Sequence, residues 1–420
     1  MRKLYSILFY FAVPFILLRL FLKSLKFPEY RQRINERFSF GKLSHLKPVD
    51  VWIHAVSLGE VVAATPLIDG LLAKKFRVLI TTMTPSGSAQ VIRRFGSNVV
   101  HQYVPYDIPW CLNRFINKIK PQICITLETE LWPNLIYQVS KHKIPLFLMN
   151  ARLSDKAFKS YIKVRFLFKP LLNKFTAILA QSDEDARRYI ALGCSPNLVE
   201  MIGNIKFDLN IEVNENKDCV AIKEKIGTSR TVLIAASTHE GEEKQLLSIL
   251  DKLKKAIPKI VLFLVPRHSQ RFQSVYDLCL ANNYKTGLRS KLDTINDNVD
   301  IVIIDSLGEL FNFYQVSDYA FVGGSLVPIG GHNVLEPIAL KVPVFCGPYM
   351  NNSAAICRDL VAAKALGMVE NVDELSSKII EMYNNPGQRQ QQTLNGYLFI
   401  DANKGVVTKS IKKFEEVLAH

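Results

Sequence analysis

The chain lacks the short motifs of several common nucleotide-binding and metal enzymes. Its 420 residues contain no G-x-x-x-x-G-K-[ST] sequence, and no G-x-G-x-x-G follows the first predicted strand of either half. These absences exclude a P-loop enzyme and disfavour a dinucleotide-dependent oxidoreductase. There is no H-E-x-x-H sequence, and the seven cysteines form no C-x-x-C pair. We therefore expect buried, reduced thiols in a cytosolic compartment, no metal site and no cofactor.

Acidic residues are fewer than basic residues in this chain. The chain has 38 Asp and Glu against 53 Lys and Arg, a formal net charge of +15. That balance indicates an anionic partner, which could be nucleic acid, a lipid surface or a phosphorylated substrate. The length exceeds that of one ordinary domain, so two domains are expected.

One long apolar run stands at the N-terminus. Residues 4–18 are apolar except for Ser6 and Pro14, which is marginal for a membrane span of roughly twenty residues. No small-x-small cleavage site follows, so residues 1–25 are predicted to be an uncleaved membrane anchor. The excess of Lys and Arg after the run places the rest of the chain on the cytoplasmic side. A buried core helix is the alternative.

From residue 49 onward, short apolar runs alternate with helix-forming sequence. The predicted strands are 51–56, 77–82, 122–127, 144–149 and 177–180, and then 231–236, 260–265, 300–304, 319–322 and 342–345. Such alternation predicts two doubly wound α/β domains with parallel sheets, whose ligands lie at the carboxyl ends of the strands. The predicted bounds are 26–210 for the first domain, 211–218 for a linker, 219–395 for the second domain, and 396–420 for a C-terminal helix that packs back across the domain junction.

The most informative segment is 320–337. A short strand is followed by the pairs Gly323-Gly324 and Gly330-Gly331, and a helix is predicted to begin near Asn333 with Glu336 in its first turn. Paired glycines allow a close approach of the backbone, and helix-opening N–H groups attract anions, most often phosphate. A tight turn without a ligand is the alternative.

Polar residues also follow other predicted strands. Glu60 follows the first strand, residues 128–134 follow the third, Arg267 and His268 follow the 260–265 strand, and residues 305–310 follow the next. Helix capping accounts for some of the acids. It does not account for the two cations, which are unfavourable near a helix N-terminus without an anion. Together these residues predict a substrate cleft between the domains.

Asp183 and Asp185 form a D-x-D pattern that can hold a metal. Ser182 precedes it, however, and a helix from Glu184 to Leu192 follows. We interpret the pattern as a serine N-cap with an acidic first turn, and we expect a metal-independent reaction.

Residues 156–174 interleave lysine and arginine with phenylalanine and tyrosine. A basic, aromatic-rich helix can lie on an anionic membrane or bind a phosphorylated lipid. An ordinary amphipathic helix is an equal alternative. Single-stranded nucleic acid also suits this pattern, but no nucleic-acid motif accompanies it, so no such partner is expected.

Six ordered blocks resemble the 3-deoxy-D-manno-octulosonic acid (Kdo) transferases. The blocks are HAVSLGEV (54–61), ETELWPN (128–134), NIKFD (204–208), PRH (266–268), DSLGEL (305–310) and GGSLVPIGGHNVLEP (323–337). Val334 stands where the family more often has proline, which is favourable but not required at the start of a helix. The resemblance implies a GT-B fold, with two Rossmann-like domains facing a central cleft. It also implies inverting, metal-independent transfer of Kdo from CMP-Kdo to lipid IVA in lipopolysaccharide synthesis, at the cytoplasmic side of the bacterial inner membrane.

The same resemblance implies roles for individual residues. Glu60 is the expected proton acceptor, and Glu130 and Lys206 are expected to stabilise the transition state. The residues expected to bind CMP are Arg267, His268, Gly308, Glu309, Leu310, Asn333, Val334, Leu335 and Glu336. Independently of the family, the helix dipole favours the ionised Glu60 carboxylate that a general base requires.

Two other functions are compatible with parts of the sequence. One is a different GT-B enzyme, such as a membrane-associated transferase or epimerase that acts on a UDP-sugar. The other is a non-enzymatic, membrane-tethered protein that binds nucleic acid or anionic lipid. The second leaves the acids at the strand ends without a purpose.

Overall fold

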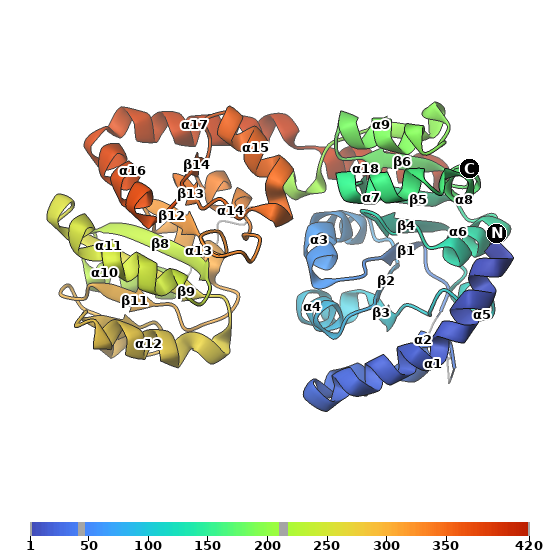
Figure 1. The fold of residues 1–420 in the computed structure, drawn as a ribbon, viewed down its shortest axis with the longest axis horizontal. Helices are drawn as coiled ribbons and strands as arrows, with labels where there is room; N and C mark the ends of the chain where they lie inside the picture. The colour runs from blue at the N-terminus through green and yellow to red at the C-terminus, as the bar shows by residue number, and fades with distance from the viewer. Residues whose placement is uncertain (1, 41–46, 210–216, 419–420) are drawn as a thin grey trace. The chain divides into compact units, whose positions relative to one another are not determined.

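The computed structural model describes residues 2–40, 47–209 and 217–418, which form two compact units (Figure 1). The first unit comprises Met1–Asp208 and Asn403–His420, and the second comprises Leu209–Ala402. The N-terminal helix is thus counted with the first unit, and the chain returns to that unit at Asn403 rather than at 396. The predicted linker 211–218 lies outside the described residues except for its last two, which begin helix α10.

The first unit is built on a parallel sheet in the order β3-β2-β1-β4-β5-β6-β7. Its strands are β1 (Val51–His54), β2 (Val78–Thr82), β3 (Val100–Tyr103), β4 (Ile123–Leu127), β5 (Leu146–Ala151), β6 (Ala177–Ala180) and β7 (Val199–Met201). Alternate residues of β1 point to opposite faces: Trp52 joins one core cluster, and Val51 and Ile53 join the other. Both faces are therefore buried, as the continuous apolar runs predict.

Helices cover both faces of this sheet. Side chains of α5, α6, α8 and α9 fill one core cluster, and those of α3, α4 and α18 fill the other. The helices of this unit are α1 (Arg2–Lys26), α2 (Ile34–Arg37), α3 (Leu58–Ala73), α4 (Pro85–Phe95), α5 (Pro109–Ile119), α6 (Pro133–Lys141), α7 (Asp155–Ile162), α8 (Arg165–Leu172), α9 (Asp183–Ala191) and α18 (Val406–Leu418).

The second unit has a parallel sheet in the order β10-β11-β9-β8-β12-β13-β14. Its strands are β8 (Thr231–Thr238), β9 (Ile260–Pro266), β10 (Thr286–Leu288), β11 (Ile301–Ile303), β12 (Tyr319–Val322), β13 (Val344–Cys346) and β14 (Gly367–Met368). Its helices are α10 (Lys217–Ile226), α11 (Glu242–Ala256), α12 (Phe272–Ala281), α13 (Leu310–Gln315), α14 (Leu335–Ala339), α15 (Ala354–Ala362), α16 (Val372–Asn384) and α17 (Pro386–Asn403). Apolar side chains of α11, α12 and α16 form one core with the sheet.

All ten predicted strands are present, and the described residues form four further strands that were not predicted. The additional strands β3, β7, β10 and β14 are the outermost strands of the two sheets. An edge strand has one neighbour and is partly exposed, so it carries no long apolar run. Glu200 and Met201 in β7, for example, are exposed.

The prediction of one basic helix over residues 156–174 was wrong. The segment forms two short helices, α7 and α8, which are separated at Lys163 and Val164. Val164 has non-helical dihedral angles (φ −121°, ψ 30°). The break lets the Tyr161 ring stack on Phe168 at 4.4 Å, which folds the two helices against each other.

The C-terminal helix α18 packs on the first unit. Phe414 meets Phe147 of β5 at 4.8 Å between ring centroids, and a Cβ added at Gly70 of α3 would lie 2.6 Å from Ile411. The Asp208 carboxylate accepts hydrogen bonds from the N–H groups of Gly405 (2.6 Å) and Val407, and so joins the two chain segments of this unit.

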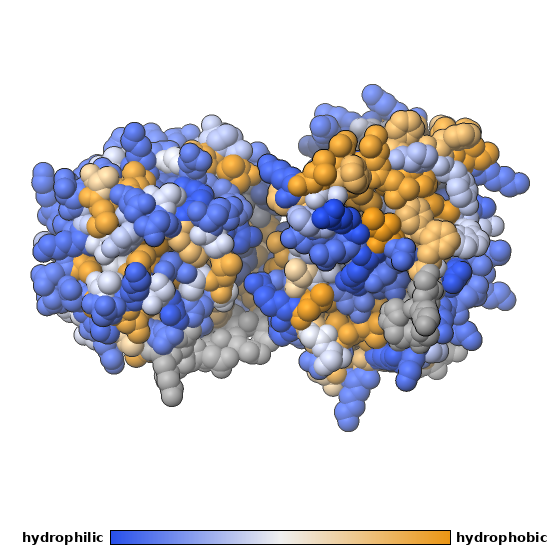
Figure 2. Space-filling view, turned by 90° about the horizontal axis from the view of Figure 1, so that it is seen from below, coloured by the Kyte–Doolittle hydropathy of each residue, from blue (hydrophilic) through white to orange (hydrophobic). Residues whose placement is uncertain are grey.

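Helix α1 lies along the first unit with one face against it. Among the described residues it is the one helix long and apolar enough to cross a membrane, by length and composition. The Ser6 hydroxyl donates to Asn134 Oδ1 (2.9 Å), and Phe9, Val13, Ile16 and Leu20 pack on Tyr106, Ile108 and Cys111. The opposite face is exposed, with Phe11 and Phe15 more than 70% accessible. Figure 2 shows broad apolar surface on this unit, viewed from the side of α1 in Figure 1.

Candidate active site

The acids of the first unit gather where its strand order reverses. Strands β1 and β4 are neighbours at the centre of the sheet, and their connections leave in opposite directions. Ligands of doubly wound sheets bind at such a switch point, beyond the carboxyl ends of the strands. Glu60 follows β1, and Glu128 and Glu130 follow β4. The fold therefore brings together acids that lie about seventy residues apart in the chain.

Glu60 lies in the first turn of α3, after the N-cap Ser57. Its carboxylate accepts hydrogen bonds from the Val56 N–H (2.9 Å) and the Ser57 hydroxyl (3.1 Å). The residue is only 8% exposed. Burial, with the nearby Glu130 and Glu128 carboxylates, raises the pKa of Glu60 to about 7, although the two hydrogen bonds oppose the shift. A carboxylate with this pKa can accept a proton at neutral pH.

Glu130 is held by Trp132, whose indole N–H donates to its carboxylate at 2.5 Å. Burial raises the pKa of Glu130, the hydrogen bond from Trp132 lowers it, and the Glu128 carboxylate raises it further. Glu128 itself has a left-handed backbone (φ +51°), and its carbonyl accepts from the Arg152 N–H (3.2 Å). Strained backbone of this kind is concentrated at functional sites.

Lys206 lies in a single 3-10 turn (Ile205–Phe207) that contacts α3. Asn204 caps this turn by accepting from the Lys206 N–H (3.0 Å), and Asn150, at the end of β5, accepts from the Ile205 N–H (3.1 Å). The Lys206 side chain is half-buried, and no ion pair to it occurs within residues 2–40, 47–209 and 217–418. The structure thus places this cation on the same unit and against the same helix as Glu60.

In the second unit, a cluster of basic side chains lies at the corresponding switch point. His239 follows β8, the double-glycine loop with His332 follows β12, and Arg267 and His268 follow β9. The His239 and His332 rings are stacked, with their Nε2 atoms 2.9 Å apart, and His268 meets His239 edge-on at 5.4 Å between centroids. His239 and His332 were not among the predicted site residues. Their shared position at strand ends was the available signal.

The positive surroundings affect the histidines directly. Burial, followed by the charges of Arg267, His239 and His268, lowers the pKa of His332 to about 4. Burial and the neighbouring cations also lower the pKa of His239. The His332 ring is therefore neutral at pH 7 in the free protein, and its surroundings also favour the neutral form of His239. A bound anion would be favoured at this position, because its negative charge offsets the repulsion among the neighbouring positive charges.

The first glycine pair does not offer its N–H groups to a ligand, which corrects the predicted anion site there. The Glu242 carboxylate of α11 accepts from the N–H groups of Gly324 (2.7 Å), Ser325 (3.0 Å) and Leu326 (3.0 Å). It also accepts from the His239 N–H (2.9 Å). A Cβ at Gly323 would lie 2.7 Å from the Ser237 carbonyl, so glycine permits this close approach. The anion that the loop binds is thus a side chain of the protein.

We expect Glu242→Gln to lower stability sharply. Glutamine has one acceptor oxygen, so two buried N–H groups lose their partners, at about 1–3 kcal/mol each. Thermal unfolding should therefore show a loss of roughly 2–6 kcal/mol. The control Glu240→Gln changes an exposed acid nearby and should stay within about 0.5 kcal/mol. Equal melting temperatures for the two variants would contradict this role of Glu242.

The remaining predicted nucleotide residues lie at the starts of two helices in contact, α13 and α14. Asn333 donates to the Glu336 carboxylate (2.9 Å) and accepts from the Leu335 N–H (3.1 Å). Burial raises the pKa of Glu336, and the Asn333 hydrogen bond and the charge of Arg267 oppose this shift. Val334 and Leu335 are buried. Glu309, between Gly308 and Leu310, forms an ion pair with Arg289 (2.8 Å), so its side chain already has a structural partner.

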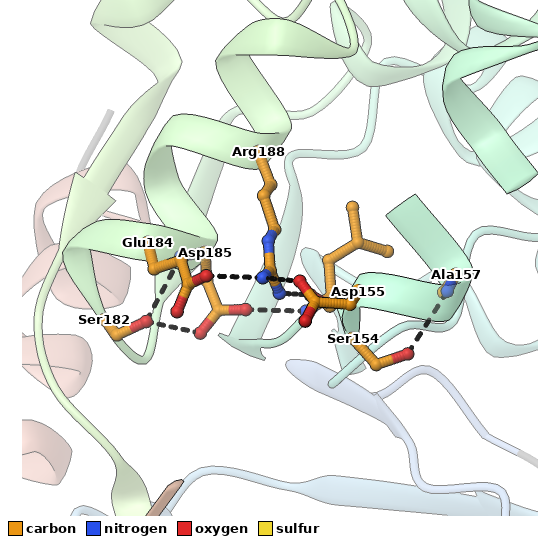
Figure 3. Close-up of polar contacts among 8 residues, drawn as sticks. Ser154, Asp155, Ala157, Ser182, Glu184, Asp185 and Arg188 are labelled. Atoms are coloured by element: carbon orange, nitrogen blue, oxygen red, sulfur yellow. Dashed lines mark hydrogen bonds and ion pairs between the residues drawn. The ribbon is translucent and has the colours of Figure 1, made fainter. Parts of the chain in front are cut away.

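Two of the acidic residues after Ser182, Glu184 and Asp185, have ion-pair and capping roles (Figure 3). Ser182 is the N-cap of α9, accepts from the Asp185 N–H (3.1 Å) and donates to its carboxylate (2.6 Å), which confirms the predicted serine cap. Asp185 also accepts from the Leu153 N–H (2.7 Å). Arg188 lies between Glu184 and Asp155 and pairs with both. This cluster joins the start of α7 to α9.

Comparison with known proteins identifies the family. The family model for "3-Deoxy-D-manno-octulosonic-acid transferase (kdotransferase)" matches residues 32–209. A 3-deoxy-D-manno-octulosonic acid transferase of Haemophilus influenzae is 38% identical over 412 residues, covering 97% of this chain and 96% of that protein. Another, from Rickettsia bellii, is 30% identical and covers 98% of each chain.

Solved structures confirm the fold. A UDP-GlcNAc 2-epimerase from Neisseria meningitidis matches with a TM-score of 0.60 at 16% identity, over 87% of this chain and 99% of that one. At this identity the likeness extends to the fold alone, two Rossmann-like domains of the GT-B type, as predicted. The sequence relatives decide the activity: this chain belongs to the 3-deoxy-D-manno-octulosonic acid transferase family and is a glycosyltransferase.

Proposed function

We propose that this protein transfers Kdo from CMP-Kdo to lipid IVA, with inversion at the anomeric carbon, during lipopolysaccharide synthesis. The observation that carries the proposal is Glu60, a buried carboxylate with a pKa of about 7 at the switch point of the first unit. An inverting transfer needs such a group, because a base must take the proton of the acceptor hydroxyl as its oxygen attacks the sugar.

The first unit is proposed to hold the acceptor. Glu60 takes the hydroxyl proton, the new carbon–oxygen bond forms at the anomeric carbon, and the bond to the CMP phosphate breaks. Lys206 offsets negative charge on the departing phosphate and on the Kdo carboxylate. Glu130, held by Trp132, keeps the Glu60 pKa high. Its proposed role is to stabilise the charge that develops on the sugar ring.

The second unit is proposed to hold the donor. Arg267 and His268 contact the CMP phosphate, with His239 and His332 behind them. The starts of α13 (Gly308, Glu309, Leu310) and α14 (Asn333, Val334, Leu335) form the nucleotide pocket. Glu336 accepts from ribose hydroxyls. Because Glu309 is paired with Arg289, its contribution comes from the backbone.

Helix α1 is proposed to attach the enzyme to the cytoplasmic side of the bacterial inner membrane. Its exposed apolar face supports this proposal, as do the basic residues that follow the N-terminal run. A helix with one face on the protein and the other exposed suits insertion beside the domain, at the surface of a bilayer. The net charge of +15 adds attraction to anionic lipid.

Activity should persist in excess EDTA. Arg267, His268 and Lys206 supply positive charge for the leaving phosphate, and Asp185 of the D-x-D pattern already accepts hydrogen bonds from Leu153 and Ser182. The measurement is the initial rate of Kdo transfer with and without chelator. An absolute Mg²⁺ requirement at the chemical step would contradict the proposal.

Binding of CMP should take up protons at pH values above about 4, the His332 pKa in the free protein, and below the His332 pKa in the complex. The His332 pKa is about 4 in the free protein, and a bound phosphate raises it, so affinity increases as pH falls between the free and bound pKa values. Calorimetry in buffers of different ionisation enthalpy measures the uptake. The His332→Gln variant should take up fewer protons than the wild-type protein. Because the ionisation of CMP itself is the same in both titrations, the difference in proton uptake comes from the protein. Equal uptake by the two proteins would contradict a role for His332.

The direct test of the function is incubation of the purified protein with CMP-Kdo and lipid IVA, followed by mass spectrometry of the lipid. A mass increase of one or more Kdo units supports the proposal. Absence of any Kdo adduct, or turnover of a UDP-sugar instead, would refute it.

A further inference from the structure

An apolar pocket of about 680 Å³ lies in the first unit between α1, α8 and the start of α6. We call it the α1–α8 pocket. Leu4 and Leu8 line it from α1, Trp132 and Tyr137 from the α6 region, and Phe166 and Leu167 from α8. The volume is within the range of about 300–1,000 Å³ that is common for small-molecule sites.

We propose that the α1–α8 pocket binds a fatty-acyl chain of the acceptor lipid. The inference rests on the proposed function and adds to it a site for the hydrophobic part of the substrate. Asp107 is the one acid that lines the pocket, and its carboxylate is satisfied by the N–H groups of Asn134 (3.0 Å) and Leu135 (2.7 Å). The rest of the lining is apolar apart from two cations and tyrosine hydroxyls, so it favours a hydrocarbon occupant.

The pocket is connected to the candidate active site through Trp132. The Trp132 ring lines the pocket, while its indole N–H donates to Glu130 at 2.5 Å. Glu130 in turn raises the pKa of Glu60. A ligand with its sugar at these carboxylates can therefore extend its chain past Trp132 into the pocket.

Two cations at the pocket match a phosphorylated lipid. Arg2 and Lys174 lie over the Tyr137 ring, at 3.6 Å and 5.6 Å from its centroid. The pocket also continues into the exposed apolar face of α1, since Leu4 and Leu8 are 54% and 61% exposed. An acyl chain can thus pass from a bilayer into the pocket along apolar surface. These observations favour a membrane lipid with anionic groups over a soluble apolar metabolite.

The kinetic test compares a fully acylated phosphorylated disaccharide acceptor with the same acceptor after removal of its chains, both in detergent. The readout is the ratio of the two kcat/KM values. Each methylene group buried contributes about fourfold to binding. The substitution Leu8→Trp fills the pocket from α1 and should reduce this ratio tenfold or more. The substitution Leu167→Trp fills the pocket independently from α8 and should have the same effect. The control Leu18→Trp changes an exposed leucine of α1 that does not line the pocket, and should leave the ratio unchanged.

A binding test does not depend on activity. In Trp110→Phe protein, a fatty acid with a nitroxide on its chain should quench Trp132 fluorescence saturably, while Trp52 is buried in the core and contributes a constant background. Adding Trp132→Phe should abolish the saturable quenching. Absence of quenching would refute an acyl site at this position.

The outcomes separate this inference from the proposed function. Transfer of Kdo by the wild-type protein, with the same kcat/KM ratio for Leu8→Trp, Leu167→Trp and Leu18→Trp, would refute the acyl site alone. Quenching without any change in the ratio would mean that the pocket holds bilayer lipid rather than the acceptor, and would also refute it. Transfer to neither acceptor would refute the proposed function and, with it, the acceptor site.

Discussion

Glu60→Gln should slow Kdo transfer by roughly a hundredfold to ten-thousandfold, the usual effect of removing a general base. Glutamine preserves the shape of the side chain and can still accept from the Val56 N–H, but it cannot take a proton from the acceptor hydroxyl. The affinity for CMP should change little, because the proposed donor residues belong to the second unit.

The pH dependence provides a second measurement on the same variant. With a Glu60 pKa of about 7, the carboxylate becomes protonated as pH falls below 7, so kcat/KM of the wild-type protein should decline there. The residual activity of Glu60→Gln should lack this decline. A well-folded variant with near-normal turnover would remove Glu60 from the mechanism and direct attention to Glu130.

Lys206→Met should reduce kcat by roughly a hundredfold to a thousandfold, comparable to the loss of one electrostatic stabiliser of a developing negative charge. The backbone of the turn should persist, since Asn204 and Asn150 hold its N–H groups rather than the lysine side chain. The expected signature is a lower kcat with a nearly unchanged KM for CMP-Kdo.

Lys206→Arg is the matched control, because it keeps the charge and changes the donor geometry. It should retain more activity than Lys206→Met, with both melting temperatures near that of the wild-type protein. If the two variants are equally impaired and equally unstable, Lys206 is a structural residue. If both are fully active, the leaving phosphate is neutralised by other groups.

The interior of both sheets could be predicted because its physical signal is local. Each central strand is buried on both faces, so a continuous apolar run such as residues 122–127 marks it without knowledge of its neighbours. The edge strands could not be predicted in this way. Residues 199–201 and 286–288 become strands only because a neighbouring strand offers them unpaired backbone N–H and C=O groups.

Part of the candidate site was also visible locally. A Ser57 N-cap followed three residues later by Glu60 is a capping motif that can be recognised in the sequence. The structure shows the Glu60 carboxylate accepting from the Val56 N–H and the Ser57 hydroxyl. The raised pKa of Glu60 was not visible, since it comes from burial and from Glu130, seventy residues away. Its role as the base stays a prediction.

By itself, the sequence determined the family, the two α/β domains and the N-terminal apolar helix, because ordered motifs, apolar periodicity and long apolar runs are properties of neighbouring residues. Only the tertiary structure decided which anion fills the glycine loop, since Glu242 lies 82 residues from Gly324. It likewise decided that His239 meets His332 and that α1, α6 and α8 enclose a pocket. These features depend on contacts between residues distant in the chain, and no local pattern specifies such contacts.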